Sequence, residues 1–192
     1  AEHNALDRAD FAQRPDGRGR PPFNPALETL RPVLQRQLRL AIEPRSALMV
    51  DRAARVAREL GLEFLLVSSG QEWRRPELAQ AAGVPFIVPV NFPAAPKMPE
   101  DDDWNAVSLD QLRAWDWAAE NAAVLRKQSI EIALTTFGLS DRKTFRKNLR
   151  LALDRGLTED EALAALTTVP ARLCGLEKKF GAIEPGRPAN LT

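Results

Sequence analysis

The chain has 192 residues, 44% of them hydrophobic, which suffices for one domain with a real core and excludes a disordered tail. Its 27 lysines and arginines against 26 aspartates and glutamates leave a net charge of +1. Attraction to nucleic acid or to an anionic membrane therefore does not dominate its interactions, and we expect neither partner. No apolar run approaches the roughly 18 residues of a membrane span, so we expect a soluble protein of unknown cellular location. A single histidine excludes a His-rich metal site built from this chain alone.

The first segments mix loop and helix signals. Residues 1–25 combine charge with Gly and Pro, which predicts a loop or linker. A short helical turn is expected over residues 26–34, and the brief alternation of residues 38–43 is typical of a strand. Ser46 then has the position of a helix N-cap and Gly61 that of a C-terminal stop. Between them, apolar residues recur three or four apart, which predicts a helix: Met49, Ala53, Val56, Ala57 and Leu60.

The order of strand and helix repeats three more times. Short apolar runs predict strands buried on both faces at residues 63–68, 85–90 and 130–135. A helix is expected over residues 72–82, and a longer one after the capping-box pair Ser108 and Gln111. This alternation favours an α/β fold with a parallel sheet. A closed (β/α)8 barrel takes about 250 residues, so the chain corresponds to about half of one, or to an open four-stranded sheet.

Three further elements are expected near the C-terminus. An amphipathic helix with Phe145 facing inward ends at Gly156. Thr158 and Glu161 repeat the capping-box spacing, and two short helices broken at Pro170 should follow. Residues 180–192 are typical of a strand, a Pro-Gly turn and the start of another strand.

Local patterns alone indicate no catalytic site. His3 has no ligand partner at helical spacing and is interpreted as a surface residue, and the acidic run 100–103 lacks the spacing of a calcium loop. The basic residues within 142–150 are interpreted as a solvated helix face. Cys174 is expected to be a buried, inert thiol that forms no internal disulfide. The strand-to-helix turn of residues 68–72 lacks both the nucleophile elbow and the phosphate-binding glycine pattern.

One longer stretch, residues 156–192, carries a more specific pattern. A helix ending in T-x-x-P-A-x-L-x-G leads into G-x-I-E-x-G-x-x-A-N-L, formed by Thr167, Pro170, Ala171, Leu173, Gly175, Gly181, Ile183, Glu184, Gly186, Ala189, Asn190 and Leu191. This pattern resembles the C-terminal signature of the amidohydrolase superfamily, imidazolonepropionase-like branch. Weaker similarity extends back to about residue 26. The resemblance implies that residues 26–179 are the C-terminal half of a (β/α)8 TIM barrel, about strands five to eight. Residues 180–192 would begin a small β-sandwich domain.

The resemblance also implies where metal ligands should lie. Members of this family bind one or two divalent, zinc-like metal ions that activate water for attack on a C–N bond. The histidine of the fifth strand falls on Glu43, the histidine of the sixth on Ser69, and the aspartate of the last strand on Phe137. None matches, so no catalytic residue can be transferred and no metal is expected in this chain.

Three functions stay open at this point. The resemblance implies a parent hydrolase of amide C–N bonds, in which this segment is a degenerate, non-catalytic half-barrel or receives its metal ligands from another region. Alternatively, the segment is a metal-free scaffold that binds partners. Its expected partners are then the rest of the parent barrel, the β-sandwich domain and a sister amidohydrolase domain. The third alternative is an open α/β binding module.

Overall fold

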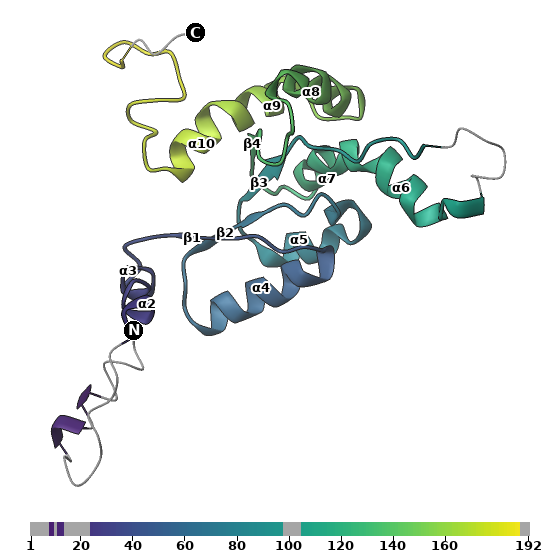
Figure 1. Cartoon of the computed structure of the whole chain (residues 1–192). Helices are drawn as coiled ribbons and strands as arrows, with labels where there is room; N and C mark the ends of the chain where they lie inside the picture. Colours follow the sequence, from purple (N-terminus) through teal and green to yellow (C-terminus); the bar gives the residue numbers. More distant parts are fainter. Residues whose placement is uncertain (1–7, 10, 14–23, 98–104, 189–192) are drawn as a thin grey trace.

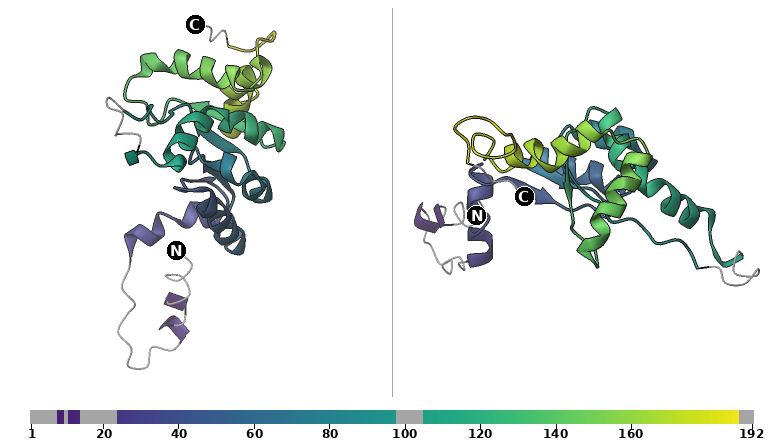
Figure 2. Two further views of the ribbon diagram at one scale, coloured as in Figure 1. Left: turned by 90° about the vertical axis from the view of Figure 1, so that its right-hand side faces the viewer. Right: turned by 90° about the horizontal axis from the view of Figure 1, so that it is seen from above.

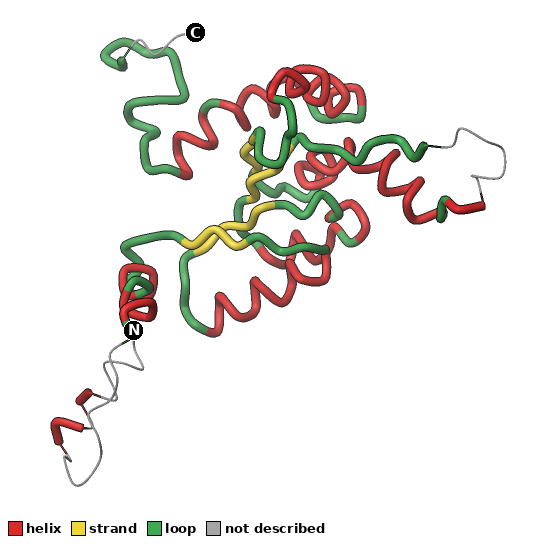
Figure 3. Tube along the Cα trace, viewed as in Figure 1, coloured by secondary structure: helices red, strands yellow, loops and turns green. Residues whose placement is uncertain are grey.

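The fold is built on one parallel β-sheet. The structure is a computed structural model that describes residues 8–9, 11–13, 24–97 and 105–188. In this part of the chain the sheet has four strands in the order β1-β2-β3-β4 (Figures 1 and 3). The strands are β1 (Leu40–Ile42), β2 (Phe64–Val67), β3 (Phe86–Pro89) and β4 (Ile132–Thr135). Each pairs in parallel with the next, which confirms the expected α/β fold with a parallel sheet.

Helices connect the strands and cover the sheet. Every second strand residue, such as Leu66, Phe86 and Ile132, packs into one core cluster with helix residues. In the first view of Figure 2, the helices that follow β1 lie at one end of the sheet and those that follow β4 at the other. The helices are α2 (Pro25–Glu28), α3 (Arg31–Leu34), α4 (Ala47–Glu59), α5 (Pro76–Ala82), α6 (Leu109–Trp117), α7 (Asn121–Lys127), α8 (Phe145–Asp154), α9 (Glu159–Leu166) and α10 (Thr168–Leu173). Short 3-10 turns are η1 (Glu72–Arg74), η3 (Ala118–Glu120) and η4 (Arg142–Thr144).

The predicted helix starts are confirmed by their caps. The Ser46 hydroxyl accepts a hydrogen bond from the Met49 amide at the start of α4. Ser108 with Gln111 and Thr158 with Glu161 both form complete capping boxes, at α6 and α9. Caps are local interactions across three residues, so sequence spacing alone predicts them.

The predicted helix is confirmed as α4, but most of the apolar residues that mark it in the sequence do not form its buried face. Its buried residues are Ala47, Val50, Ala54 and Ala57. Met49, Val56 and Leu60 are 44%, 54% and 60% exposed. Because α4 packs closely against α5, the small side chains occupy the contact and the larger apolar ones form an adjacent exposed stripe.

Proline positions correct two predicted helices. The helix expected over residues 72–82 is divided into η1 and α5 at Arg75, because the residue before Pro76 is disfavoured in the helical conformation. Pro170 does not break a helix. It lies in the first turn of α10, where its missing N–H has no intrahelical partner to lose, and the break falls at Thr167.

The two ends of the chain also differ from the prediction. Within residues 1–25, the described residues 8–9 and 11–13 have helical backbone, because residues such as Ala and Gln favour helix there. Residues 180–188 form turns and bends instead of the expected strand, since no strand in the described part of the chain pairs with them; the start of the second expected strand, residues 189–192, lies outside the described residues. Ile183 is 87% exposed. Cys174, expected to be buried, is exposed at the end of α10.

No helix in the described ranges is long and apolar enough to cross a membrane.

Candidate functional site at the carboxyl ends of the strands

The three positions singled out by sequence lie together in space. Glu43, Ser69 and Phe137 each follow a strand, and parallel strands end at the same edge of a sheet. All three line one cavity of about 300 Å³, which we call the mouth cavity. Ser68, Gly70, Pro89, Asn91 and Gly138 also line it, together with Pro44 and Arg45.

Two of these three side chains are open to solvent. Glu43 is exposed, and Phe137 is 55% exposed. The backbone N–H of Phe137 donates to Thr135 Oγ1 at 3.2 Å. Phe137 lines the mouth cavity, and its phenyl ring offers no lone pair to a cation.

The third side chain, Ser69, is held by a buried glutamate. Glu72 is completely buried in η1. Its Oε1 accepts from the Ser69 backbone N–H and from Ser69 Oγ, both at 2.7 Å. Its Oε2 accepts from Ser68 Oγ at 2.5 Å and from Asn121 Nδ2 at 2.8 Å. Four donors, all neutral, thus satisfy one carboxylate.

The serine hydroxyls in this network are already held by hydrogen bonds within the turn. Ser69 Oγ gives its proton to Glu72 and accepts from the Gln71 N–H at 3.3 Å. Ser68 Oγ accepts from the Gly70 N–H at 3.1 Å and from Asn121 Nδ2 at 3.0 Å. Each hydroxyl is therefore committed to the β2–η1 turn.

Asn121 connects this turn to α7. In addition to its two donated bonds, its Oδ1 accepts from the Trp73 backbone N–H at 2.8 Å. The Trp73 indole N–H donates to the Gly70 carbonyl at 3.1 Å. Sequence reasoning missed both Glu72 and Asn121. The SSGQE stretch does place a glutamate after two serines, but Asn121 lies 49 residues further on and no pattern marks it.

The side chains at the mouth do not fit a divalent metal centre. A catalytic zinc ion takes about three protein ligands plus water, usually from Cys, His or carboxylate side chains, and here one glutamate is joined by a serine and a phenylalanine. In the described ranges, no three His, Cys, Asp or Glu side chains lie close enough together to hold a metal ion.

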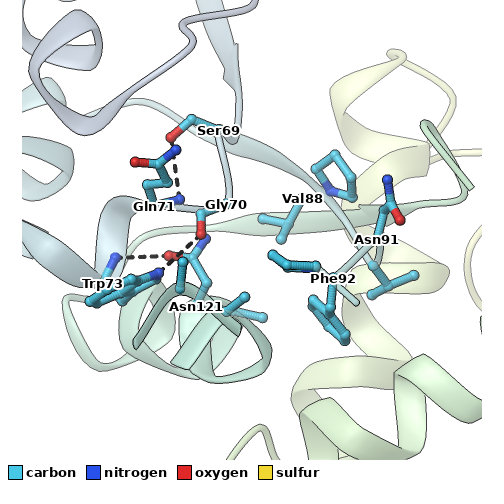
Figure 4. Close-up of a pocket in the computed structure, with 14 residues that line it drawn as sticks. Ser69, Gly70, Gln71, Trp73, Val88, Asn91, Phe92 and Asn121 are labelled. Carbon is cyan, nitrogen blue, oxygen red and sulfur yellow. Dashed lines mark hydrogen bonds between the residues drawn. The ribbon is translucent and has the colours of Figure 1, made fainter. Parts of the chain in front are cut away.

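A second cavity, also of about 300 Å³, adjoins the mouth cavity, and we call it the helix-side cavity (Figure 4). Trp73 and Asn121 lie on one side of it, and Val88 and Phe92 on the other. Its wall also includes Ala118 from η3, together with Ser69, Gly70, Gln71, Pro89, Val90, Asn91, Pro93, Ala114 and Ala122. It therefore lies between the sheet and the helix layer and is lined by neither Glu43 nor Phe137.

These features define an α/β protein with a parallel sheet and a cavity at the carboxyl ends of its strands. The sequence profile of the amidohydrolase family matches residues 79–192, more than half of the chain. The chain belongs to the amidohydrolase family. A comparison with curated proteins finds none that matches.

Solved structures share the fold. An amidohydrolase from Thermotoga maritima MSB8 superposes with a TM-score of 0.69 at 22% identity, over 97% of this chain and 45% of that one. A second amidohydrolase has a TM-score of 0.59 at 15% identity, over 83% and 38%. A prolidase complexed with N-methylphosphonate-L-proline has a TM-score of 0.53 at 14% identity, over 78% and 36%. The chain thus spans less than half the length of these structures.

Proposed function

We propose that this chain is the C-terminal half, strands five to eight, of an amidohydrolase-type barrel with a degenerate mouth, and that it serves as a non-catalytic scaffold. Hydrolysis of amide C–N bonds would then belong to another part of the parent protein. The observation that carries the proposal is the side-chain chemistry of the mouth, where the three positions that the resemblance aligns with metal ligands are Glu43, Ser69 and Phe137. The Ser69 hydroxyl donates its proton to Glu72 and accepts from the Gln71 N–H, and a neutral hydroxyl is not among the ligands that zinc ordinarily takes.

The neighbouring positions support the same proposal. Glu43 is a possible ligand, but a single carboxylate binds a divalent ion weakly. Phe137 contributes an apolar ring where a carboxylate would have to stand. The hydrogen bonds around Glu72 hold the turn after β2 without a metal ion, as expected for a non-catalytic scaffold.

The exposed surfaces of the half-barrel indicate what the scaffold contacts. β1 and β4 are the outer strands of the sheet, and each has one edge without a strand partner in the described part of the chain. The exposed stripe of Met49, Val56 and Leu60 lies on α4, the helix that follows β1, and on its C-cap residue. A further strand and helix of the parent barrel would cover both features.

Calorimetric titration of metal-stripped protein with zinc tests the proposal. We expect no stoichiometric binding to the wild type, and the same trace for Glu43→Ala and for the control Glu63→Ala, whose carboxylate is exposed away from the mouth. Stoichiometric binding at micromolar affinity that Glu43→Ala abolishes and Glu63→Ala retains would overturn the degenerate mouth and restore the alternative of an active hydrolase.

A further inference from the structure

We propose that one face of η4 and α8 binds an extended acidic peptide segment whose carboxylates stand at alternate positions. The face consists of cationic side chains and is called the basic face: Arg142, Lys143, Arg146, Lys147 and Arg150. None of these residues lines either cavity, so the inference concerns a separate surface. It goes beyond the proposed function and does not depend on whether the mouth holds a metal ion.

The opposite side of α8 fixes the basic face in place. Phe145, Leu149 and Leu153 pack against the hydrophobic core. Asn148 Nδ2 donates to the Val90 carbonyl, at the end of β3, over 2.7 Å. The helix is therefore held by contacts in which the cations take no part, and the basic face is formed before any partner arrives.

The charge of the basic face is not balanced within the described ranges. All five cations are exposed, and none of them belongs to an ion pair there. Arginines close to α8 are paired: Arg155 bonds to Asp116 and Glu120, and Arg126 of α7 bonds to Glu161. Since the whole chain carries a net charge of only +1, its free positive charge is concentrated where the fold supplies no carboxylate.

Two carboxylates flank the basic face without neutralising it. The Asp141 side chain caps η4 and accepts from the Lys143 N–H at 2.9 Å. Asp154 is exposed at the end of α8, and the described ion pairs do not join it to Arg150, four residues earlier. A membrane plane would bring anionic headgroups against Asp154 as well, whereas a narrow partner covers the cations alone.

The spacing of the arginines matches an extended peptide. Arg142, Arg146 and Arg150 are four residues apart, so they form one row with steps of roughly 6 Å along the helix. In an extended peptide, alternate side chains point to the same side and lie roughly 7 Å apart. Acidic residues at every second position can therefore each meet one guanidinium, with Lys143 and Lys147 in a second row beside them.

The basic face lacks the features of a nucleic-acid site. None of its side chains is aromatic, whereas single-stranded nucleic acid ordinarily stacks its bases on aromatic rings. Leu151, four residues after Lys147, is 40% exposed and borders the cations. It offers an apolar contact that a peptide side chain can use and a phosphate cannot. These observations favour an acidic peptide as the partner.

Two isomeric peptides test the arrangement of charge. Acetyl-Ser-Glu-Ser-Glu-Ser-Glu-Ser-amide has its carboxylates at alternate positions, and acetyl-Ser-Ser-Glu-Glu-Glu-Ser-Ser-amide has the same carboxylates in succession. Ligand-observed NMR at low salt measures their binding to the full natural polypeptide. We expect a Kd on the order of 1 mM for the alternating peptide and binding at least about threefold weaker for its isomer. Equal binding of the two, or no binding of the alternating peptide, overturns the proposal.

Competition distinguishes the classes of polyanion. Oligothymidylate and phosphatidylserine vesicles are added at the same concentration of negative charge as the alternating peptide. We expect neither to displace more than about half of the bound peptide. Complete displacement by either would assign the basic face to nucleic acid or to a membrane and would refute the peptide.

Two triple variants locate the binding. The first removes the arginine row, and the second removes the same charge from exposed positions elsewhere that have no described ion pair. They are Arg142→Gln/Arg146→Gln/Arg150→Gln and the control Arg39→Gln/Arg52→Gln/Lys127→Gln. The first should weaken binding of the alternating peptide about tenfold, and the control should change its Kd by less than about twofold. Equal weakening in both would mean that net charge alone attracts the peptide, and wild-type affinity in the first would place the peptide elsewhere, so either result refutes the assignment.

Discussion

Asn121 donates a hydrogen bond of 2.8 Å to Glu72 across 49 positions of sequence, and both side chains are at most 2% exposed. This bond joins α7 to the turn after β2 and thereby holds two successive strand-helix units together. Because every donor around Glu72 is neutral, the carboxylate depends on the full set of four bonds for its stability in the interior.

The first prediction concerns this carboxylate. Glu72→Gln exchanges one acceptor oxygen for an NH₂ group that faces donors, so at least one buried donor loses its partner. We expect the free energy of unfolding to fall by about 3 kcal/mol. Urea titration measures it, with Glu63→Gln as an exposed control that should change stability by less than about 0.5 kcal/mol. An equal stability of the two variants would show that the network does not hold the turn.

The second prediction is a pH dependence at Glu161. Burial alone would raise the pKa of this carboxyl, but hydrogen bonds from Thr158 and the ion pair with Arg126 outweigh it and lower the pKa below 4.5. A lowered folded-state pKa adds stability that is fully present above the unfolded value and is lost as the pH falls through the folded one.

The comparison of wild type with Glu161→Gln measures this effect. The variant should be less stable by about 1 kcal/mol at pH 7, and the difference should shrink below about pH 4.5. Unfolding free energies at pH 7, 5, 4 and 3 give the curve. A difference that stays constant over this range would contradict a titrating contribution from Glu161.

The third prediction concerns the tail after α10. Gly181 has a φ of +92°, and a Cβ there would lie 2.9 Å from both Ala171 Cβ and the Thr167 carbonyl. Gly186 has a φ of +86° with nothing within 4 Å, so it is the matched control for backbone strain.

Gly181→Ala should therefore push the tail away from α10. We expect the free energy of local opening to fall by about 2 kcal/mol more than in Gly186→Ala, because only the former adds a steric clash. Amide hydrogen exchange at Lys179 and Phe180, whose N–H groups both donate to the Leu176 carbonyl, should then accelerate about thirtyfold relative to the control. Equal exchange in the two variants would mean that the close approach costs nothing.

The fourth prediction concerns the exposed stripe on α4. The 192-residue chain expressed alone should self-associate or bind a dye for apolar surface, since the stripe and two sheet edges are open. The double variant Val56→Lys, Leu60→Gln should lower the dye signal about twofold. It should leave the free energy of unfolding unchanged within about 0.5 kcal/mol. Leu109→Gln, at a residue 61% exposed on α6, is the control. A dye signal that responds equally to the control would not come from the stripe.

Much of the fold was readable in the sequence because its signals are local. Alternation at residues 38–43 and three short apolar runs predicted the four strands of the described sheet. The position of Ser46 before its helix and the capping-box spacing at Ser108 and Thr158 predicted the three caps. Glu43, Ser69 and Phe137 each follow a strand and were therefore expected to lie together, because parallel strands end on the same side of the sheet. All three line one cavity.

Only the tertiary structure decided which apolar stripe of α4 is buried and what surrounds Ser69. Periodicity defines two adjacent stripes on that helix, and the close contact with α5 selects the one with alanines at Ala47, Ala54 and Ala57. The bond between Glu72 and Asn121 depends on how α7 packs against the β2–η1 turn. The sequence by itself determined the elements and their order, whereas side-chain partners distant in sequence depend on packing, which no local pattern records.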